Sequence, residues 1–410
     1  GSSAPCSGRI TISSLSPFTK YNAIVDAHMG GDTAVRMKNC GFDAMIIEGA
    51  SDVPVYIYVN DDKIEIRDAS HVWGKTTSDT TAILTKETDP SSNVVSIGPA
   101  GEALLNLSCV MTGIGHCGGG GLGKVFGSKK LKAVVFNGTK GTEIADPERV
   151  VALNKYVIGD LMGSNNNHVV PTVPQSWAEY DNKSTRWTGH PGMTWGAAEG
   201  GPIDTGESAI AGDKTAVYIS HRLSSCKFCD DIAVFDHGAI AEKYTVKMTG
   251  CAMCPIRCYG SVFIPQMEKA TGVVGSHANT CGAQNGFNLS ALMTKFNDVE
   301  EEGDGKLIGS VYGAILSDDL GLWENYGELP ATLKYFMKDD YKLMKQILTE
   351  EEFNAIDWSK RDNGDLTFMN DIAKCLLDPN HSMHNLTMGA YYIAEKYHDI
   401  LGDEYLHSQA

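Results

Sequence analysis

The chain has 410 residues, 42% of them hydrophobic, which is enough for two or three domains with sizeable cores. Its 34 Lys plus Arg against 51 Asp plus Glu give a net charge of -17, which argues against nucleic acids and anionic membranes as partners. No stretch approaches the roughly 18 uncharged apolar residues that span a bilayer. The 11 cysteines are an odd number and several have metal-ligand spacing, so we expect a reducing compartment, the cytoplasm.

The first third of the chain is rich in strand-forming residues. Residues 55–59 and 63–67 are two such runs on either side of a polar turn, which predicts a hairpin. Short strands are also expected at 44–47 and at 131–136, each closed by glycine or asparagine.

The pattern changes after about residue 142. Asp146 is placed to cap a helix that begins with Pro147, and longer helical patterns follow, most clearly over 332–348 and 387–397. The predicted fold class is therefore α+β, with a β-rich domain followed by a mostly α-helical one. The predicted divisions are 1–144 for the β-rich domain, 145–380 for the helical domain and 381–410 for the start of a further helical domain.

Residues 163–206 form a long segment rich in Gly, Asn, Pro and Trp. Trp177, Trp187 and Trp195 argue against a disordered linker, so we predict a packed functional loop. An ordered surface segment that only covers another element is the alternative.

Three closely spaced cysteines, Cys251, Cys254 and Cys258, are the strongest chemical signal. Thiolates at this spacing can supply three of the four ligands of an iron-sulfur cluster. Zinc is the alternative, but zinc motifs normally contain two pairs, and no second pair follows at a typical distance. An upstream pair, Cys226 and Cys229, is followed by acidic residues that would not stabilise thiolates, so we expect a solvated pair without a site, with a regulatory or adventitious metal pair as the alternative.

A glycine-rich segment at 117–125 contains partial matches to two nucleotide-binding motifs. A Rossmann loop should directly follow a hydrophobic strand, which 113–116 is not, and a P-loop needs a hydroxyl where this chain has Val125. Four consecutive glycines would still let backbone amides approach a phosphate-sized anion. Residues 97–102 give a second strand, glycine turn and helix where an anion could bind, although each segment alone is more often a tight turn.

A third signal is the run of residues 318–323, which begins with two aspartates after an apolar helical stretch. The simpler interpretation is an acid-rich helix end that stops at Gly321. The functional interpretation is a carboxylate that the glycine turn aims at a ring N–H donor.

Together these motifs resemble the aldehyde ferredoxin oxidoreductase superfamily, the tungsten or molybdenum bis-pyranopterin enzymes. The resemblance includes the cysteine motif and the turn at Asp318, and extends over segments 3–9, 16–17, 41–44, 64–69, 73–75, 97–102, 127–129 and 131–133. The YdhV-type branch looks most similar, on segments 26–31, 165–168, 174–180 and 195–202.

The resemblance implies a β-rich base for two pterins whose phosphates meet at a shared Mg2+. Arg9 would bridge pterin and cluster. The phosphate and magnesium region would include Asp26, His28, Gly30, Gly31, Gly118, Gly119, Gly120 and Gly121. The first of two pterin-recognising turns would include Asp318, Gly321 and Leu322.

The chain also departs from the family pattern. The fourth cluster cysteine would lie on a second such turn, which is absent, and the context of Cys375 does not match it; we therefore expect a family member that lacks an N-terminal and a larger C-terminal part. The glutamate expected after the cluster motif is missing too. Cys281 stands near that position and could bind the metal, as in the related aryl-CoA reductases, or be a buried thiol. His168 is the candidate for proton transfer, with a structural histidine as the alternative.

The resemblance implies a cytoplasmic oxidoreductase that oxidises an aldehyde-type substrate or reduces the corresponding acid. Electrons would pass through one 4Fe-4S cluster to a ferredoxin-like carrier or a partner iron-sulfur subunit. A reductase of acyl-CoA or aryl-CoA substrates with the same cofactors is one alternative, and a non-enzymatic iron-sulfur electron carrier is another. Homodimerisation is left open.

Overall fold

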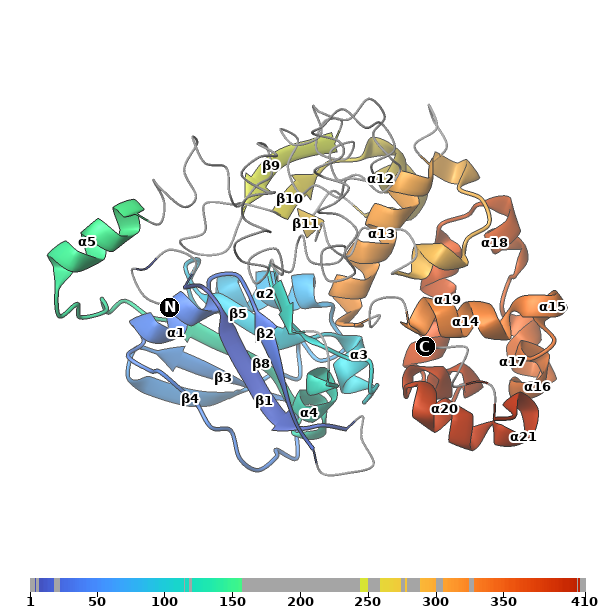
Figure 1. Ribbon diagram of the computed structural model, residues 1–410, viewed down its shortest axis with the longest axis horizontal. Coiled ribbons are helices and arrows are strands. Elements are labelled where there is room, and N and C mark those ends of the chain that lie inside the picture. Colours follow the sequence, from blue (N-terminus) through green and yellow to red (C-terminus); the bar gives the residue numbers. More distant parts are fainter. Residues whose placement is uncertain are drawn as a thin grey trace, which may run out of the picture.

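The computed structural model describes residues 4, 7–17, 23–113, 115–117, 120–156, 244–249, 259–273, 277–278, 288–299, 305–323, 328–403 and 405. The N-terminal part is built on a mixed six-stranded sheet with the order β4-β3-β8-β5-β6-β7 (Figure 1). The strands β3 and β8 are parallel and the other neighbours are antiparallel. Their bounds are β3 Val55–Asn60, β4 Lys63–Asp68, β5 Asn93–Ile97, β6 Val110–Thr112, β7 Gly115–Cys117 and β8 Leu131–Asn137.

Both faces of this sheet are covered, because alternate residues of its central strands point to opposite sides. On one side Val95 and Val134 pack with the antiparallel hairpin of β1 (Ile10–Leu15) and β2 (Ile24–Met29). The helices α1 (Thr33–Asn39) and α4 (Leu122–Ser128) contribute to the same core. On the other side Val94 and Val135 pack with Leu84 of α2 (Thr77–Glu87).

The expected strands in this part are confirmed with one exception. The hairpin of β3 and β4 and the strand β8 form as predicted. The prediction of a strand at 44–47 is wrong, because these residues pair with no strand. Met45 and Ile47 instead pack their side chains against the core beneath the hairpin, which accounts for their apolar character.

The remaining described residues are mainly helical. Asp146 caps α5 (Pro147–Lys155) by accepting a hydrogen bond from the Arg149 amide, as the sequence predicts. A small sheet has the order β11-β10-β9, from β9 (Thr245–Thr249), β10 (Tyr259–Val262) and β11 (His277–Ala278). The helical elements are α12 Pro265–Thr271, η2 Leu289–Leu292, η3 Asn297–Val299, α13 Gly305–Leu320, α14 Glu328–Phe336, α15 Lys338–Tyr341, α16 Met344–Ile347, α17 Glu350–Ala355, α18 Ser359–Asn363, α19 Thr367–Leu377, η5 Ser382–Thr387, α20 Ala390–Lys396 and α21 His398–Leu401.

Two helices differ from their predicted lengths. The helix expected over 332–348 ends at Phe336 and is followed by the short α15 and α16, because Asp339 and Asp340 have left-handed backbone angles, φ 51 and 55°. The helix expected from 387 starts at Ala390, after Gly389 with φ 91°.

The α13 helix joins the two parts of the molecule. Its residues Ile308, Val311 and Ile315 are buried in a large helical core, and that core also contains Ala100, Leu105 and Leu107 from the N-terminal part. Figure 1 shows the C-terminal end of α13 beside α2 and above α3 (Pro99–Glu102). Within the described residues, no helix is long and apolar enough to cross a membrane.

Candidate functional site

The C-terminal end of α13 forms a glycine-terminated turn. The amide of Leu322 donates to the carbonyl of Ser317 (2.9 Å), and the amide of Gly321 donates to the carbonyl of Asp318 (3.1 Å). Gly321 has a φ of 65°, so the pair of bonds is a Schellman motif. The simpler interpretation of residues 318–323, a helix end at Gly321, is therefore confirmed.

This turn is docked on the backbone of the N-terminal part. The amide of Cys109 donates to the carbonyl of Gly321 (2.9 Å), and the amide of Trp323 donates to the carbonyl of Leu107 (2.8 Å). A Cβ atom on Gly321 would lie 2.8 Å from the amide nitrogen of Gly98. The turn at Asp318 and the glycine turn at Gly98, 220 positions apart in sequence numbering, thus form a single packed junction.

The first turn of α2 holds the same junction from another side. The Thr77 hydroxyl donates to the carbonyl oxygen of Asp318 (2.8 Å). The Ser78 hydroxyl donates to the carboxylate of Asp319. Thr77 is 6% exposed, so its hydroxyl is committed to this contact.

The two carboxylates at the turn have an unfavourable environment. Burial, together with the charge of neighbouring Asp319, raises the pKa of Asp318 to about 8. Burial also raises the pKa of Asp319, while its hydrogen bond from Ser78 acts in the opposite direction. The C-terminal end of a helix disfavours negative charge as well. Among the residues that the structure describes, none donates a hydrogen bond to the Asp318 carboxylate, so this group has an unused capacity for a donor.

A buried ion pair lies behind the junction. Lys132 Nζ is 2.5 Å from Glu102 Oε1, with side-chain exposures of 0% and 7%. Lys132 Nζ also donates to the carbonyl of Lys75 (2.8 Å), and the Gly74 amide donates to Glu102 Oε2 (2.7 Å). Burial raises the pKa of Glu102 and lowers that of Lys132, so each charge depends on its partner.

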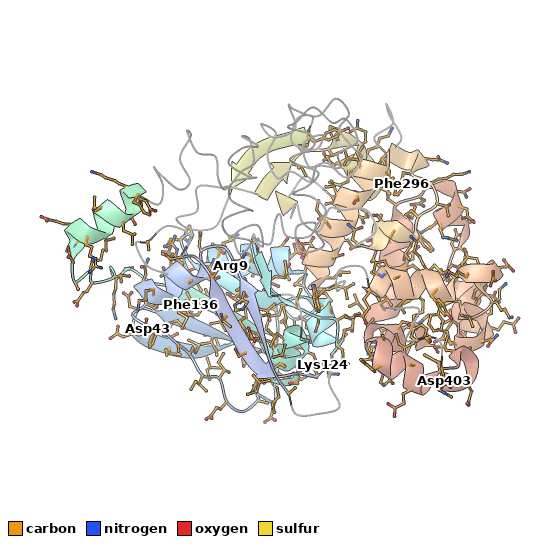
Figure 2. The ribbon with its side chains drawn as sticks, in the orientation of Figure 1. Arg9, Asp43, Lys124, Phe136, Phe296 and Asp403 are labelled. Atoms are coloured by element: carbon orange, nitrogen blue, oxygen red, sulfur yellow. The ribbon has the colours of Figure 1, made fainter. Side chains whose placement is uncertain are left out.

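A second group of candidate residues lies on the hairpin of β1 and β2. His28 Nε2 is 3.1 Å from Asp26 Oδ2, and its Nδ1 is 2.8 Å from the Thr11 hydroxyl. Asp26 and His28 are exposed, so their polar atoms are accessible to a ligand. Figure 2 labels Arg9, also exposed, just before β1.

The turn of Gly30 and Gly31 links this hairpin to the buried start of α1. The Thr33 hydroxyl donates to Asn93 Oδ1 (2.7 Å) and lies 3.3 Å from the Thr112 hydroxyl. These bonds fix the turn to the start of β5 and the end of β6, and Gly31 has a φ of 89°.

The glycine loop before α4 packs against the hairpin. A Cβ atom on Gly120 would lie 2.3 Å from the Val25 side chain, and one on Gly121 would lie 2.5 Å from Pro17. Both glycines have positive φ, 66 and 71°. These two positions therefore require glycine for protein packing alone, and they bring the loop beside β2.

Lys124 follows this loop and points into the protein. Its Nζ donates to Asn106 Oδ1 (2.7 Å), and burial lowers its pKa. The loop also follows the short β7, which is antiparallel to β6 rather than part of a parallel crossover. Both observations agree with the sequence argument against a P-loop and a Rossmann loop.

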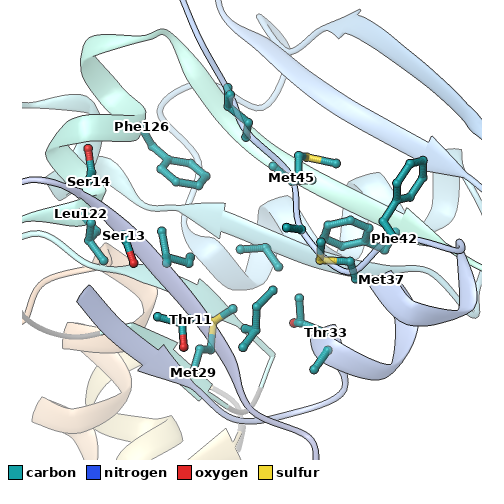
Figure 3. A pocket seen from close by; sticks show the side chains of 18 of the residues that line it. Thr11, Ser13, Ser14, Met29, Thr33, Met37, Phe42, Met45, Leu122 and Phe126 are labelled. Atoms are coloured by element: carbon teal, nitrogen blue, oxygen red, sulfur yellow. The ribbon is translucent and has the colours of Figure 1, made fainter. Parts of the chain in front are cut away.

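A cavity of about 580 Å³ lies between the hairpin and the sheet (Figure 3). Its walls are mainly apolar and include Met29, Met37, Phe42 and Phe126. Arg9 is the one predicted site residue that lines it. Because the titratable candidates gather elsewhere, we place the candidate site at the Asp318 junction and the hairpin rather than in this cavity.

Comparison with known proteins identifies the relationship. Residues 1–138 match the family described as aldehyde ferredoxin oxidoreductase, N-terminal domain. The chain is 33% identical over 308 residues, 74% of its length, to the tungsten-containing aldehyde ferredoxin oxidoreductase of Pyrococcus horikoshii. It is 32% identical over 305 residues to the protein of that name from Pyrococcus furiosus. The chain belongs to the aldehyde ferredoxin oxidoreductase superfamily. It spans 45% of the length of each of these relatives.

Two further similarities widen this relationship. An aliphatic sulfonate oxidoreductase, WOR-like subunit, from Pyrococcus furiosus is 31% identical over 160 residues, 35% of this chain and 25% of that protein. A solved structure described as the active site complex BamBC of benzoyl coenzyme A reductase in complex with 1,5 dienoyl-CoA has a TM-score of 0.67. It covers 99% of this chain and 54% of that one at 23% identity, so it shows a shared fold.

The predicted superfamily residues fall into three groups. The structure brings Asp26 next to His28, and brings Gly321 and Leu322 against the N-terminal part. The hairpin and the junction are separate groups. Arg9 directly precedes β1, whose first residue Ile10 pairs with Met29, the residue before the Gly30–Gly31 turn. Outside the described residues lie the predicted positions His168, Cys281, Gly118, Gly119, Cys251, Cys254 and Cys258. Within the described residues, no three His, Cys, Asp or Glu side chains form a metal site.

The sequence argument missed the roles of Thr77, Ser78, Glu102 and Lys132. Three segments that resemble the superfamily meet at the Glu102–Lys132 pair, namely 73–75, 97–102 and 131–133. The resemblance of these segments was the clue in the sequence that could have pointed to the pair. Cys375, the downstream cysteine, lies in α19, where burial and nearby acidic residues raise its pKa to about 11. It is a neutral thiol there, consistent with its unmatched context.

The residues at the junction fit a pterin-type ligand. A half-buried carboxyl group without a donor partner among the described residues suits a ring that offers N–H groups, and the backbone packing at Gly98 and Gly321 holds the turn that carries it. The exposed Asp26 carboxylate and His28 ring offer the oxygen and nitrogen atoms that Mg2+ and phosphate groups bind.

Proposed function

We propose that the protein is a bis-pterin oxidoreductase of the aldehyde ferredoxin oxidoreductase type that acts in the cytoplasm. Its metal would be tungsten, with molybdenum as the second choice. It would oxidise an aldehyde-type substrate or reduce the corresponding acid. The observation that supports this most directly is the Asp318 carboxyl group, which is half-buried, has a pKa raised by burial, has no donor among the described residues and lies on a glycine-terminated turn.

Residues of the N-terminal part and of the Asp318 turn would divide the binding of the cofactor between them. Asp318, with the turn through Gly321 and Leu322, would bind one pterin ring, and Arg9 would lie between pterin and cluster. The phosphates and Mg2+ would lie near Asp26, His28, Gly30, Gly31 and the loop Gly118–Gly121. When bound, the metal would supply the two-electron chemistry as oxygen is added to or removed from a carbon centre.

The protonation of Asp318 suits this role. With a pKa of about 8, its carboxyl group is largely protonated at neutral pH and can donate one hydrogen bond while it accepts another. A ring edge that presents neighbouring N–H and carbonyl groups could use both. The Thr77 and Gly321 contacts to the Asp318 backbone carbonyl hold the backbone that carries this carboxyl group.

The remaining roles are proposed for residues outside the described part of the chain. Cys251, Cys254 and Cys258 would bind a 4Fe-4S cluster that passes electrons singly to a ferredoxin-like carrier or a partner iron-sulfur subunit. His168 would transfer a proton within the tryptophan-rich loop, and Cys281 would be a ligand of the metal. The fourth cluster ligand stays unassigned.

A reductase of acyl-CoA or aryl-CoA substrates is the second candidate. It is favoured by one observation: Cys281 stands near the position where aldehyde-oxidising members have a glutamate. The fold shared with the benzoyl coenzyme A reductase complex is compatible with it.

The two candidates are separated by an assay of the complete protein, purified without oxygen. Aldehydes should reduce an artificial viologen acceptor if the first proposal holds. Reduced viologen should instead be oxidised by an aryl-CoA thioester if the second holds. A protein that carries the iron-sulfur cluster yet does neither, and contains no tungsten or molybdenum, would be an electron carrier.

A further inference from the structure

We propose that Thr77 and Ser78, anchored by the buried Glu102–Lys132 pair, form a clamp that positions the Asp318 carboxyl group toward the pterin. This inference rests on the proposed function, since it assigns positioning residues to that site. None of the four residues is placed against the cofactor itself; they act through the backbone and through Asp319.

The anchor of the clamp is the ion pair. Lys132 and Glu102 together bind both residues of the Gly74–Lys75 turn, one through its amide and the other through its carbonyl. Both charged side chains are almost completely buried, so separating the pair would leave an unpaired charge inside the protein. The turn is therefore held firmly to β8 and α3.

The first arm of the clamp runs from this turn into α2. Thr76 follows Lys75 directly and caps the helix by accepting a hydrogen bond from the Asp79 amide. The next two residues are Thr77 and Ser78, whose hydroxyls bond to Asp318 and Asp319. Only one residue separates Lys75 from Thr77, so a shift of the anchored turn would be transmitted to the Asp318 contact.

The second arm runs through α3. Glu102 is the last residue of this four-residue helix, and Gly98 precedes its first residue. Because Gly98 packs against the backbone of Leu320 and Gly321, the ion pair also fixes the surface on which the Asp318 turn rests. The first turn of α2 and the α3 helix are thus both held by the Glu102–Lys132 pair, and both contact the Asp318 turn.

The Ser78 contact has an electrostatic part. It gives the Asp319 carboxylate a donor, and so fixes the position of the negative charge next to Asp318. Ser78→Ala would remove this hydrogen bond, and the Asp319 carboxylate could then reorient beside Asp318. A pterin ring bound by Asp318 would then face a different local field.

Thr77→Val and Ser78→Ala in the complete, cofactor-loaded protein test the clamp, with Thr81→Val as the matched control. The Thr81 hydroxyl lies on the same helix but bonds to the carbonyl of Thr77 rather than to the Asp318 turn. The first readout is amide hydrogen exchange of residues 317–322, followed by mass spectrometry. In Thr77→Val the amides of residues 317–322 should exchange about fivefold faster than in the wild type. This is the factor expected for the loss of one hydrogen bond. Thr81→Val should match the wild type.

The second readout is the electron paramagnetic resonance signal and the reduction potential of the metal centre. Both should shift in Thr77→Val and Ser78→Ala and return toward wild-type values in Thr77→Ser and Ser78→Thr. Unchanged exchange in Thr77→Val would overturn the clamp. Faster exchange with an unchanged signal and potential would overturn the positioning role and leave a structural contact. If the wild type holds neither tungsten nor molybdenum, the proposed function fails, while the exchange result still decides whether the clamp exists.

Discussion

Gly98 and Leu320 approach each other so closely that a Cβ atom on residue 98 would lie 2.3 Å from the Leu320 carbonyl oxygen. Real side chains do not reach such a distance from backbone, so residue 98 must be glycine for the two parts of the molecule to join as they do. This contact explains why a glycine stands between the strand and the short helix at 97–102. The glycine serves the packing of the Asp318 turn.

Gly98→Ala should therefore push the backbone at residue 98 away from the Leu320–Gly321 turn. The added methyl group meets the backbone of Leu320 and Gly321, so we expect a loss of about 3 kcal/mol in the free energy of unfolding, the upper range for overpacking. Gly141→Ala is the matched control, because nothing lies within 4 Å of its Cβ position. It should change stability by less than about 0.5 kcal/mol. Denaturant unfolding of both variants would measure this, and equal stabilities would contradict the described contact.

The raised pKa of Asp318 predicts a pH dependence of stability. Between its ordinary value of 3.8 and about 8, the folded protein keeps a proton that the unfolded chain has released. The stability that the folded protein gains from protonated Asp318 is thus complete below about pH 4 and is lost as the pH rises through about 8. Asp318→Asn has no such proton, so the cofactor-free variant should lose less thermal stability than the wild type between about pH 5 and about pH 8.

Other groups contribute to this slope in both proteins, including Asp319 and Glu102, whose pKa values burial also raises. The comparison of wild type with Asp318→Asn isolates the contribution of residue 318. Parallel melting-temperature curves over this range would show that the carboxyl group is ionised in the folded protein and would remove the argument from its protonation.

Much of the local structure could be predicted because it depends on neighbouring residues. The β3–β4 hairpin follows from alternation and a polar turn, and the α5 helix follows from Asp146 and Pro147. The helix end at Gly321 follows from its glycine. The break after Phe336 could not be predicted, because Asp339 and Asp340 interrupt a segment whose apolar pattern is otherwise continuous.

The junction itself could not be predicted, because its contacts join distant residues. Thr77 and Asp318 are separated by 241 positions, and single-sequence patterns carry no information about such pairs. The resemblance to the superfamily indicated that segments 73–75, 97–102 and 131–133 matter. Only the structure shows that they meet at one buried ion pair.

The cluster assignment makes a direct prediction. Complete protein purified without oxygen should contain ~4 iron atoms of cluster per chain, and Cys254→Ser should lose most of them because one of the three adjacent ligands is gone. Cys375→Ser is a useful control, since the Cys375 thiol lies in α19 with a pKa of about 11. It should keep its iron. Zinc in place of iron in the wild type would end this assignment.

His168 is the proposed proton-transfer group of the tryptophan-rich loop. His168→Asn should lower turnover by about a hundredfold, the contribution typical of a positioned acid-base group, while metal and iron contents stay at wild-type values. Steady-state kinetics with metal analysis of the same samples would check this. Full activity in the variant would make the histidine structural and the loop a cover for the site.

The metal and pterin content of the complete protein, in the wild type and in Asp318→Ala, tests the bis-pterin assignment most directly. We predict tungsten or molybdenum in stoichiometric amount with pterin in the wild type, and a marked loss of both in Asp318→Ala at unchanged iron content. A wild-type protein that holds its iron but neither metal nor pterin would contradict the proposed oxidoreductase, and full cofactor loading in Asp318→Ala would contradict the role of the Asp318 turn.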